Sequence, residues 1–354
     1  MRGLASGTGL MQARTDQYNY RRAIGALGVT VALVASGCGS GGGADGSDFP
    51  VVKVATINVL SFAPFFIAEA EGFYEEQGLA VELIQVESSG TAVAATLNGD
   101  LDVLSGTMSA GVINAIAGGE RLQIVADKGN FASDSCSYVA MMGPAELFNA
   151  DGSVDPEQVR GATIGGIRDG SLSSGLFLDQ FLKSIGLSSD DVVTQDVSRP
   201  ALAESIEGGS IDFAYTGEPW VTRVVDEGNP IVAAGQDVLA GYQFGYVSYG
   251  PRLLDDEDLG NRFMAAYLQG VRQYNQGKTD RNLEIVTLAT GLEDDLLRRA
   301  CWPDIRADGA YEAAQLVPAI EWGFETGIVD RLVSADELVD GRFAAHANEK
   351  LGSG

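Results

Sequence analysis

From Val51 onward, short apolar runs typical of β-strands alternate with longer segments whose apolar residues recur at helical spacing. Val51–Ile57 and Ala80–Val86 predict the first two strands. Pro64, between them, suits the first turn of a helix. This alternation predicts an α/β protein with mainly parallel sheets flanked by helices. Beyond Pro251 the pattern is mostly helical, with helices expected at Asn261–Asn275, Asn282–Thr290, Glu293–Ala300 and Gly309–Thr326.

The middle of the chain contains an internal repeat. Leu97–Val103 reads LNGDLDV and Glu207–Phe213 reads EGGSIDF, so each places an aspartate ahead of strand-like residues. A glycine follows each aspartate at the same spacing, Gly118 in the first copy and Gly228 in the second, and each is followed by a strand-like run. The repeat predicts two lobes of similar topology. The alternative is chance reuse of a common α/β phrase.

The length of the chain after residue 48 also favours two lobes, because it exceeds a typical single domain. We expect residues 49–140 to begin the first lobe and residues 141–240 to form the second. Residues 241–354 would then return to the first lobe as a helical tail. The chain would cross between the lobes near Tyr138–Gly143 and again near Val238–Phe244.

Residues 1–38 have the character of an export signal. Arg21 and Arg22 precede the uncharged run Ala23–Ala35, and small residues then lead into Cys38. The run is shorter than the roughly 20 residues that a membrane-spanning helix needs. Cys38 after Ala-Ser-Gly resembles a bacterial lipobox, which predicts a lipidated cysteine. An ordinary cleaved signal or a short buried helix is the alternative, and the export route stays open between Sec and twin-arginine.

Residues 39–48 are rich in glycine and serine and predict a flexible tether between the lipid and the folded body. The formal net charge of the chain is −26, a sign that repels nucleic acid and excludes it as a partner. If Cys38 carries lipid, Cys136 and Cys301 remain as a pair in an oxidising compartment. They either form a disulfide or are two separate buried thiols. With one histidine and no CxxC motif, we expect neither a metal site nor a cofactor.

Several ordered motifs resemble one family. Ala63–Val86 (APFFIAEAEGFYEEQGLAVELIQV), Leu97–Val103, Gly118–Ala126 and Glu218-Pro219 are similar to phrases of the periplasmic-binding-protein family that serves taurine, aliphatic sulfonates, nitrate and thiamine-precursor pyrimidines. The resemblance implies the type II fold, with two lobes joined by two hinge strands and closing over one ligand. We expect a monomer that works outside the cytoplasm. Nothing after the tether is long and apolar enough to cross a membrane, so the lipid is the expected attachment. The implied partner is an ABC permease with a cytoplasmic ATPase.

Ligands of open α/β sheets bind outside the carboxyl ends of the strands, so residues after the predicted strands are the site candidates. Arg168 would clamp an anion or a carbonyl oxygen, and helix N-termini would receive an anionic oxygen. A simpler role exists for each candidate: packing for an aromatic ring, helix capping for Ser173, or a solvated charge for Arg168. The candidates are Asn58, Phe62, Phe65, Ser105, Gly106, Thr107, Arg168, Ser171, Ser173, Thr216, Glu218, Trp220 and Tyr242.

The aromatic residues among the candidates favour a flat, partly apolar ligand, because rings with a few polar anchors are suited to heterocycles. A thiamine-type pyrimidine, or another heterocycle such as a flavin, is therefore the first expectation. Taurine or an aliphatic sulfonate is the second. A related pyrimidine synthase consumes its own histidine, but His346 lies in the tail, outside the predicted cleft loops. We therefore expect a binding protein rather than an enzyme, and a ligand sensor for a signalling partner is the other alternative.

Overall fold

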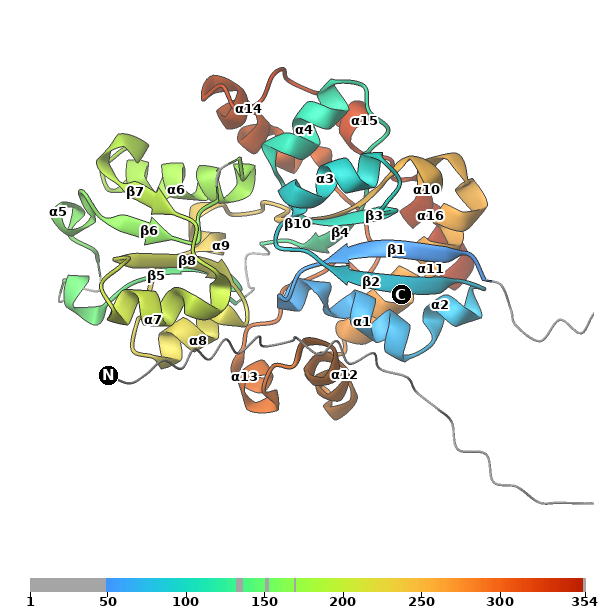
Figure 1. The fold of residues 1–354 in the computed structure, drawn as a ribbon, viewed down its shortest axis with the longest axis horizontal. Helices are drawn as coiled ribbons and strands as arrows, with labels where there is room; N and C mark the ends of the chain where they lie inside the picture. The colour runs from blue at the N-terminus through green and yellow to red at the C-terminus, as the bar shows by residue number, and fades with distance from the viewer. Residues whose placement is uncertain (1–48, 132–135, 150–152, 169, 353–354) are drawn as a thin grey trace, which may run out of the picture. The chain divides into compact units, whose positions relative to one another are not determined.

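The computed structural model describes residues 49–131, 136–149, 153–168 and 170–352. The predicted signal peptide, Cys38 and the tether lie outside the described residues. Two five-stranded sheets organise the rest, and helices cover both of them (Figure 1). We name each sheet with its helices the first lobe and the second lobe, in chain order. Among the residues described, no helix is long and apolar enough to span a membrane.

The first sheet has the strand order β2-β1-β3-β10-β4. β1 pairs in parallel with β2 and β3, whereas β10 is antiparallel to both β3 and β4. Four of its strands come from the start of the chain, and β10 arrives after the second lobe is complete. The strands are β1 (Val51–Thr56), β2 (Ala80–Gln85), β3 (Val103–Thr107), β4 (Gln123–Gly129) and β10 (Gly245–Tyr249).

The second sheet repeats this plan with the order β7-β6-β8-β5-β9. β6 pairs in parallel with β7 and β8, and β5 is antiparallel to β8 and β9. In each sheet the fourth strand in this order, β10 or β5, follows a crossing between the lobes and is antiparallel to both of its neighbours. The strands are β5 (Val139–Met142), β6 (Thr163–Gly165), β7 (Val193–Gln195), β8 (Phe213–Gly217) and β9 (Ile231–Ala234).

The sequence repeat is a structural repeat. A glycine with positive φ ends a helix in each copy, Gly99 (81°) and Gly209 (66°), a conformation that glycine adopts without strain. The aspartate that follows pins the neighbouring strand. Asp102 accepts a hydrogen bond from the N–H of Lys53 at 2.9 Å, and Asp212 accepts one from the N–H of Thr163 at 2.7 Å. In both lobes these partners are 49 positions apart.

Helices enclose the first sheet on both faces. Apolar side chains of α1, α11 and α16 pack with Val54 and Val247 on one face, while those of α3 and α4 pack with Leu104 and Ile124 on the other. The helices of this lobe are α1 (Ala63–Ala70), α2 (Phe73–Glu76), α3 (Ser89–Leu97), α4 (Ala110–Ala117), α10 (Pro251–Asp255), α11 (Glu257–Tyr274), α12 (Asp280–Thr290), α13 (Asp294–Arg299), α15 (Ala335–Leu338) and α16 (Arg342–Leu351).

The second lobe has shorter helices and a smaller separate core, in which Leu202, Ile206 and Ile211 pack beneath β8. Its longest helix, α6, begins at Leu172 where the sequence predicts a start near Ser173. The helices are α5 (Pro156–Val159), α6 (Leu172–Ser184), α7 (Leu202–Glu207), α8 (Trp220–Asp226) and α9 (Gly235–Val238).

The chain crosses between the lobes twice, and both lobes belong to one compact unit. The second crossing, residues 239–244, falls within the predicted segment. The first lies earlier than expected, between Gly129 and Val139, because β5 (Val139–Met142) already pairs with strands of the second sheet. The expected boundary at residue 140 therefore falls inside β5.

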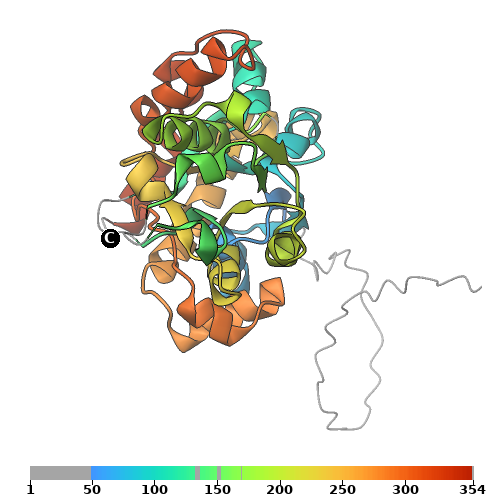
Figure 2. The same ribbon diagram turned by 90° about the vertical axis from the view of Figure 1, so that its left-hand side faces the viewer.

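The sequence predicts that the whole C-terminal region returns to the first lobe, but part of it packs on the second lobe. α14 (Val317–Glu325) packs against α6 of the second lobe (Figure 2). The side chain of Trp322 lies against Gly175. α16 does pack on the first lobe, against α11. Helical periodicity predicts that α14 exists, but it carries no information about which lobe receives its apolar face.

Candidate functional site

A cavity of about 350 Å³ lies between the two lobes. Its walls are formed by segments that follow the carboxyl ends of strands in both sheets, as expected for an α/β protein. The first lobe supplies the segments after β1, β2, β3 and β4, and the second supplies those after β6, β7 and β8. Tyr138 of the first crossing, Val139 at the start of β5, Phe244 of the second crossing and Pro303 of the tail complete the described lining.

The N-termini of three helices meet at this cavity. Ser88, Ser109 and Ser171 line it, and they are the N-cap residues of α3, α4 and α6. Each serine hydroxyl accepts a hydrogen bond from a backbone N–H of its own helix at 3.4 Å. The positive ends of helix dipoles favour negative charge, so this arrangement makes the cavity receptive to an anion.

α3 approaches the first sheet closely at Gly106. A side chain at this position would collide with Ser89, whose hydroxyl donates to the carbonyl of Thr107 at 2.9 Å. The absence of a Cβ at Gly106 therefore lets the N-terminus of α3 sit directly on the end of β3.

Seven of the predicted site residues line the cavity: Phe62, Gly106, Thr107, Arg168, Ser171, Thr216 and Glu218. Asn58 and Trp220 line a more open groove of about 640 Å³, which we name the outer groove. The outer groove shares Ile57, Arg168 and Arg199 with the cavity, so those residues stand where the two spaces meet.

The other four predicted residues lie behind the cavity wall. Phe65 is fully buried, with its ring 4.8 Å from that of Tyr267, because its face of α1 packs on α11. Ser105 donates to the carbonyl of Tyr246 at 2.9 Å, which fixes two strands together. Ser173 and Tyr242 share a hydrogen bond of 3.1 Å. These side chains support the wall and do not face the cavity.

Lys128, which the sequence analysis does not select, is a buried cation in the cavity lining. Its ammonium group donates to the hydroxyl of Ser61 at 2.7 Å and lies 3.9 Å from the centre of the Phe62 ring. The residue is 1% exposed. Burial lowers the pKa of Lys128 to about 7, Asp127 opposes that change, and Arg199 adds to it. Within the described chain, no carboxylate pairs with this ammonium group.

The carboxylate of the preceding residue, Asp127, is committed elsewhere. It accepts hydrogen bonds from the amide of Gln243 at 3.0 Å and from the backbone N–H of Arg306 at 2.9 Å. These bonds tie β4 to the second crossing and to the C-terminal tail. Because these hydrogen bonds hold the carboxylate of Asp127, it forms no ion pair with Lys128 in the described structure.

The second lobe contributes two guanidinium groups. Arg168 pairs with Asp196 at 3.1 Å, whereas Arg199 donates to the backbone carbonyl of Glu87, across the gap between the lobes, at 3.4 Å. Burial and, to a smaller extent, the charge of Arg168 lower the pKa of Arg199 to about 10, and Asp196 opposes this shift. Arg199, like Lys128, lines the cavity but is not among the site residues predicted from the sequence.

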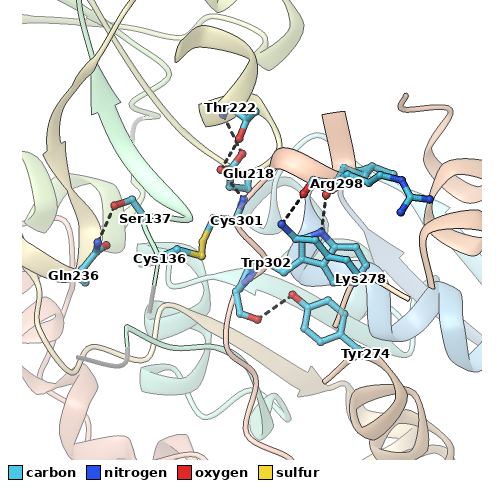
Figure 3. The surroundings of a disulfide bond; sticks show 12 residues. Cys136, Ser137, Glu218, Thr222, Gln236, Tyr274, Lys278, Arg298, Cys301 and Trp302 are labelled. Carbon is cyan, nitrogen blue, oxygen red and sulfur yellow. Dashed lines mark hydrogen bonds between the residues drawn. A yellow bond between two sulfur atoms is a disulfide. The ribbon is translucent and has the colours of Figure 1, made fainter. Parts of the chain in front are cut away.

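Glu218 lines the cavity, but its carboxylate serves the structure. It accepts hydrogen bonds from the N–H and the hydroxyl of Thr222 and from the N–H of Cys301, at 2.9–3.0 Å (Figure 3). Burial raises the pKa of Glu218, and these hydrogen bonds oppose the shift. The carboxylate therefore holds α8 and the tail in place.

A disulfide joins Cys136 to Cys301, with their Cα atoms 5.8 Å apart (Figure 3). It links the first crossing, just before β5, to the segment after α13. Trp302 beside it stacks on Tyr274, with ring centres 5.1 Å apart. The bridge therefore ties the entry of the second lobe to the tail of the first.

Backbone hydrogen bonds close the two lobes on each other. On one side of the cavity the N–H of Ala110 donates to the carbonyl of Gly170 at 2.8 Å. On the other side the N–H of Leu60 donates to the carbonyl of Glu218 at 3.0 Å. The indole of Trp220 adds a bond of 3.0 Å to the carbonyl of Asn58. These contacts describe a closed arrangement around the cavity.

Two buried hydroxyls of the lining have no hydrogen-bond partner within the described structure, those of Tyr138 and Tyr215. A buried hydroxyl without a partner is costly, so a polar atom in the cavity would stabilise both. His346 lies exposed on α16 and outside the lining. Among the described residues no group of three or more His, Cys, Asp or Glu side chains could hold a metal ion.

Two lobes with this strand order, two crossings and a cavity between them define the periplasmic-binding-protein fold. Residues 45–241 match the model of the NMT1-like family, and the chain belongs to that family. Among curated proteins, no sequence matches the chain.

Solved structures share the fold at low sequence identity. The ligand-binding component of an ABC-type import system from Staphylococcus aureus, solved with zinc bound, is 14% identical with a TM-score of 0.68; the match covers 84% of this chain and 99% of that one. The alkanesulfonate-binding protein SsuA from Xanthomonas axonopodis, bound to MOPS, is 14% identical with a TM-score of 0.65, over 81% and 97%. The desulfurization enzyme DSZB is 12% identical with a TM-score of 0.60, over 85% and 99%, so the fold also hosts an enzyme.

Proposed function

We propose that this protein is a lipid-anchored, extracytoplasmic solute-binding protein that captures a small organic anion between its lobes and delivers it to an ABC importer. The observation that carries the proposal is the buried ammonium group of Lys128, which has a hydroxyl and a ring as its protein neighbours. A buried charge without an ionic partner is costly, and an anionic ligand would compensate it. The family and the closed two-lobed fold support the same role.

The charges of the cavity support an anionic ligand over the heterocycle expected from the sequence. Lys128, Arg168 and Arg199 line a single cavity in a chain whose net charge is −26. Three helix N-termini at the same cavity act in the same direction. The rings of Phe62 and Phe244 remain available for an apolar part of the ligand. The similarity to a sulfonate-binding protein is consistent with this ranking.

A panel of solutes tests the proposal on the full-length protein purified in detergent. It contains alkylsulfonates, taurine, carboxylates, nitrate, thiamine-type pyrimidines and flavins, and thermal unfolding is the readout. A ligand at 100 times its Kd should stabilise the protein by about 2.7 kcal/mol, a shift of several degrees. We expect shifts with anions and none with uncharged heterocycles.

Two variants assign the effect to the cavity. Lys128→Met should reduce the shift sharply, and Lys183→Met, which removes an exposed lysine of α6, should preserve it. Shifts with neutral heterocycles alone would overturn the anion assignment. Equal shifts in both variants would place the ligand elsewhere.

The lipid anchor is proposed from Cys38 and is tested separately. Cells grown with labelled palmitate should incorporate the label into the wild-type chain and not into Cys38→Ser. A fully soluble, unlabelled wild-type protein would contradict the anchor without affecting the proposal about the cavity.

A further inference from the structure

Within the part of the chain that the structure describes, each lobe places at the cavity one cation that forms no ion pair with a carboxylate. Among the described residues, four charged side chains line the cavity: Lys128, Arg168, Arg199 and Glu218. Glu218 is held by Thr222 and Cys301, and Arg168 pairs with Asp196. Within the described part of the chain, Lys128 and Arg199 make no ion pair with a carboxylate.

These two cations occupy different depths. Lys128, at the end of β4 in the first lobe, lines the inner cavity alone. Arg199 follows β7 in the second lobe and lines both the cavity and the outer groove. Ile57, Phe62 and Val197 line the same cavity and provide an apolar surface. The positive charges therefore come from opposite lobes, at the inner part of the cavity and at its junction with the groove.

Closing the lobes brings these like charges into one partly dry space. Their repulsion in a medium less polar than water opposes closure, and a single negative charge can neutralise one of them only. A ligand with an anionic group at each position would neutralise both and would draw the lobes together.

We infer that the solute is an organic dianion, a dicarboxylate or a carboxylate-sulfonate, with one anionic group at Lys128 and Ser61 and the other at Arg199; this rests on the proposed function. The unpartnered hydroxyls of Tyr138 and Tyr215 would donate to its oxygens. The cavity, at about 350 Å³, is at the small end of the range for ligand pockets, so a short or single-ring spacer suits it.

A matched series of ligands tests the inference by calorimetry on the full-length protein in detergent. Succinate, glutarate, adipate and phthalate are compared with butanoate, pentanoate, hexanoate and benzoate, which retain one carboxylate. A charge-assisted hydrogen bond is worth about 1.5–3 kcal/mol, so the best dianion should bind roughly 10- to 100-fold more tightly than its monoanionic partner. γ-Aminobutyrate and taurine serve as zwitterionic probes.

Variants then assign the two charges. In Lys128→Met and in Arg199→Gln, the ratio of monoanion Kd to dianion Kd should fall toward one. Lys183→Met and Arg121→Gln, which remove exposed cations, should keep the wild-type ratio. Thermal unfolding of each ligand-free variant checks that it is folded.

Each remaining outcome is decisive. Monoanions that bind wild type within threefold of the dianions, or a preference for the zwitterions, would overturn the inference and leave the anion-binding function intact. An unchanged dianion preference in both cavity variants would also overturn it. If folded wild-type protein binds no anion of either charge, the proposed function fails as well.

Discussion

The two lobes share a topology but treat their charges differently. Asp102 and Asp212 perform the same backbone task, yet Asp102 is 3% exposed and also pairs with Arg252, whereas Asp212 is exposed. Among the cavity cations, Lys128 of the first lobe is fully buried and Arg168 of the second is partly exposed. The repeated motif around Asp102 and Asp212 should therefore contribute differently to stability in the two lobes. Substitutions in the first lobe should cost more and respond less to salt.

The disulfide is expected to have the largest effect on stability, because it adds a covalent cross-link between the lobes to the two chain crossings. It closes a loop of 165 residues, which restricts the unfolded chain. Replacing both cysteines in Cys136→Ser/Cys301→Ser should lower the free energy of unfolding by about 2–4 kcal/mol. Scanning calorimetry measures the effect. If the double variant melts with wild type, the bridge does not stabilise the fold.

The aspartate pair tests the difference in burial directly. Asp102→Ala should destabilise by about 2–3 kcal/mol, because it removes the partly buried hydrogen bond from the N–H of Lys53 and the pair with Arg252. Asp212→Ala should cost about 1 kcal/mol, as expected for one exposed hydrogen bond. Urea unfolding monitored by tryptophan fluorescence provides both values. Equal losses would show that the lobes do not differ in the way described.

Replacing the buried cation of the cavity should change the free energy of unfolding in the opposite direction. Lys128→Met should stabilise the ligand-free protein by about 1–2 kcal/mol, since it removes a desolvated charge, while Arg199→Gln should change stability by less. The gain should be largest below pH 7 and should shrink as the pH rises toward 10.5. In that interval the folded lysine is neutral and the unfolded lysine is still protonated. A destabilised Lys128→Met would mean that the ammonium group supports the fold.

The sequence predicts the fold well because the fold depends on local patterns. The repeat around Asp102 and Asp212 correctly predicts two lobes of one topology, and the second crossing lies within the predicted segment. The first crossing is displaced because Val139–Met142 has the same composition whether it links two sheets or pairs within one. Such a choice depends on partners far away in the chain.

The site is predicted less completely, for two specific reasons. The motif that contains the strand-like run after Gly118 ends at Ala126, but β4 continues to Gly129 and carries Lys128 into the cavity. The short, exposed strand β7 has little apolar signal, so the sequence analysis does not consider the segment after it, which contains Arg199. Phe65 and Ser173 show the converse limit, because position after a strand does not determine which way a side chain faces.

The pH dependence of binding follows from the same lysine. Burial lowers the pKa of Lys128 to about 7, so at pH 8 most of the ligand-free protein carries a neutral amine. An anion beside that amine favours its charged form, so binding at pH 8 requires a proton. Burial also raises the pKa of Asp127, to about 6, and this group is therefore ionised at pH 8 before and after binding. Affinity should fall by up to tenfold between pH 7 and pH 8.

The most direct test of Lys128 as the buried partner of the anion is to count the proton taken up on binding. Calorimetric titration at pH 8, in two buffers with different ionisation enthalpies, measures the protons taken up as an anion binds. Uptake should approach one proton per ligand in wild type and should be close to none in Lys128→Met. Binding without proton uptake, or equal uptake in both proteins, would contradict the assignment of Lys128 as the buried partner of the anion.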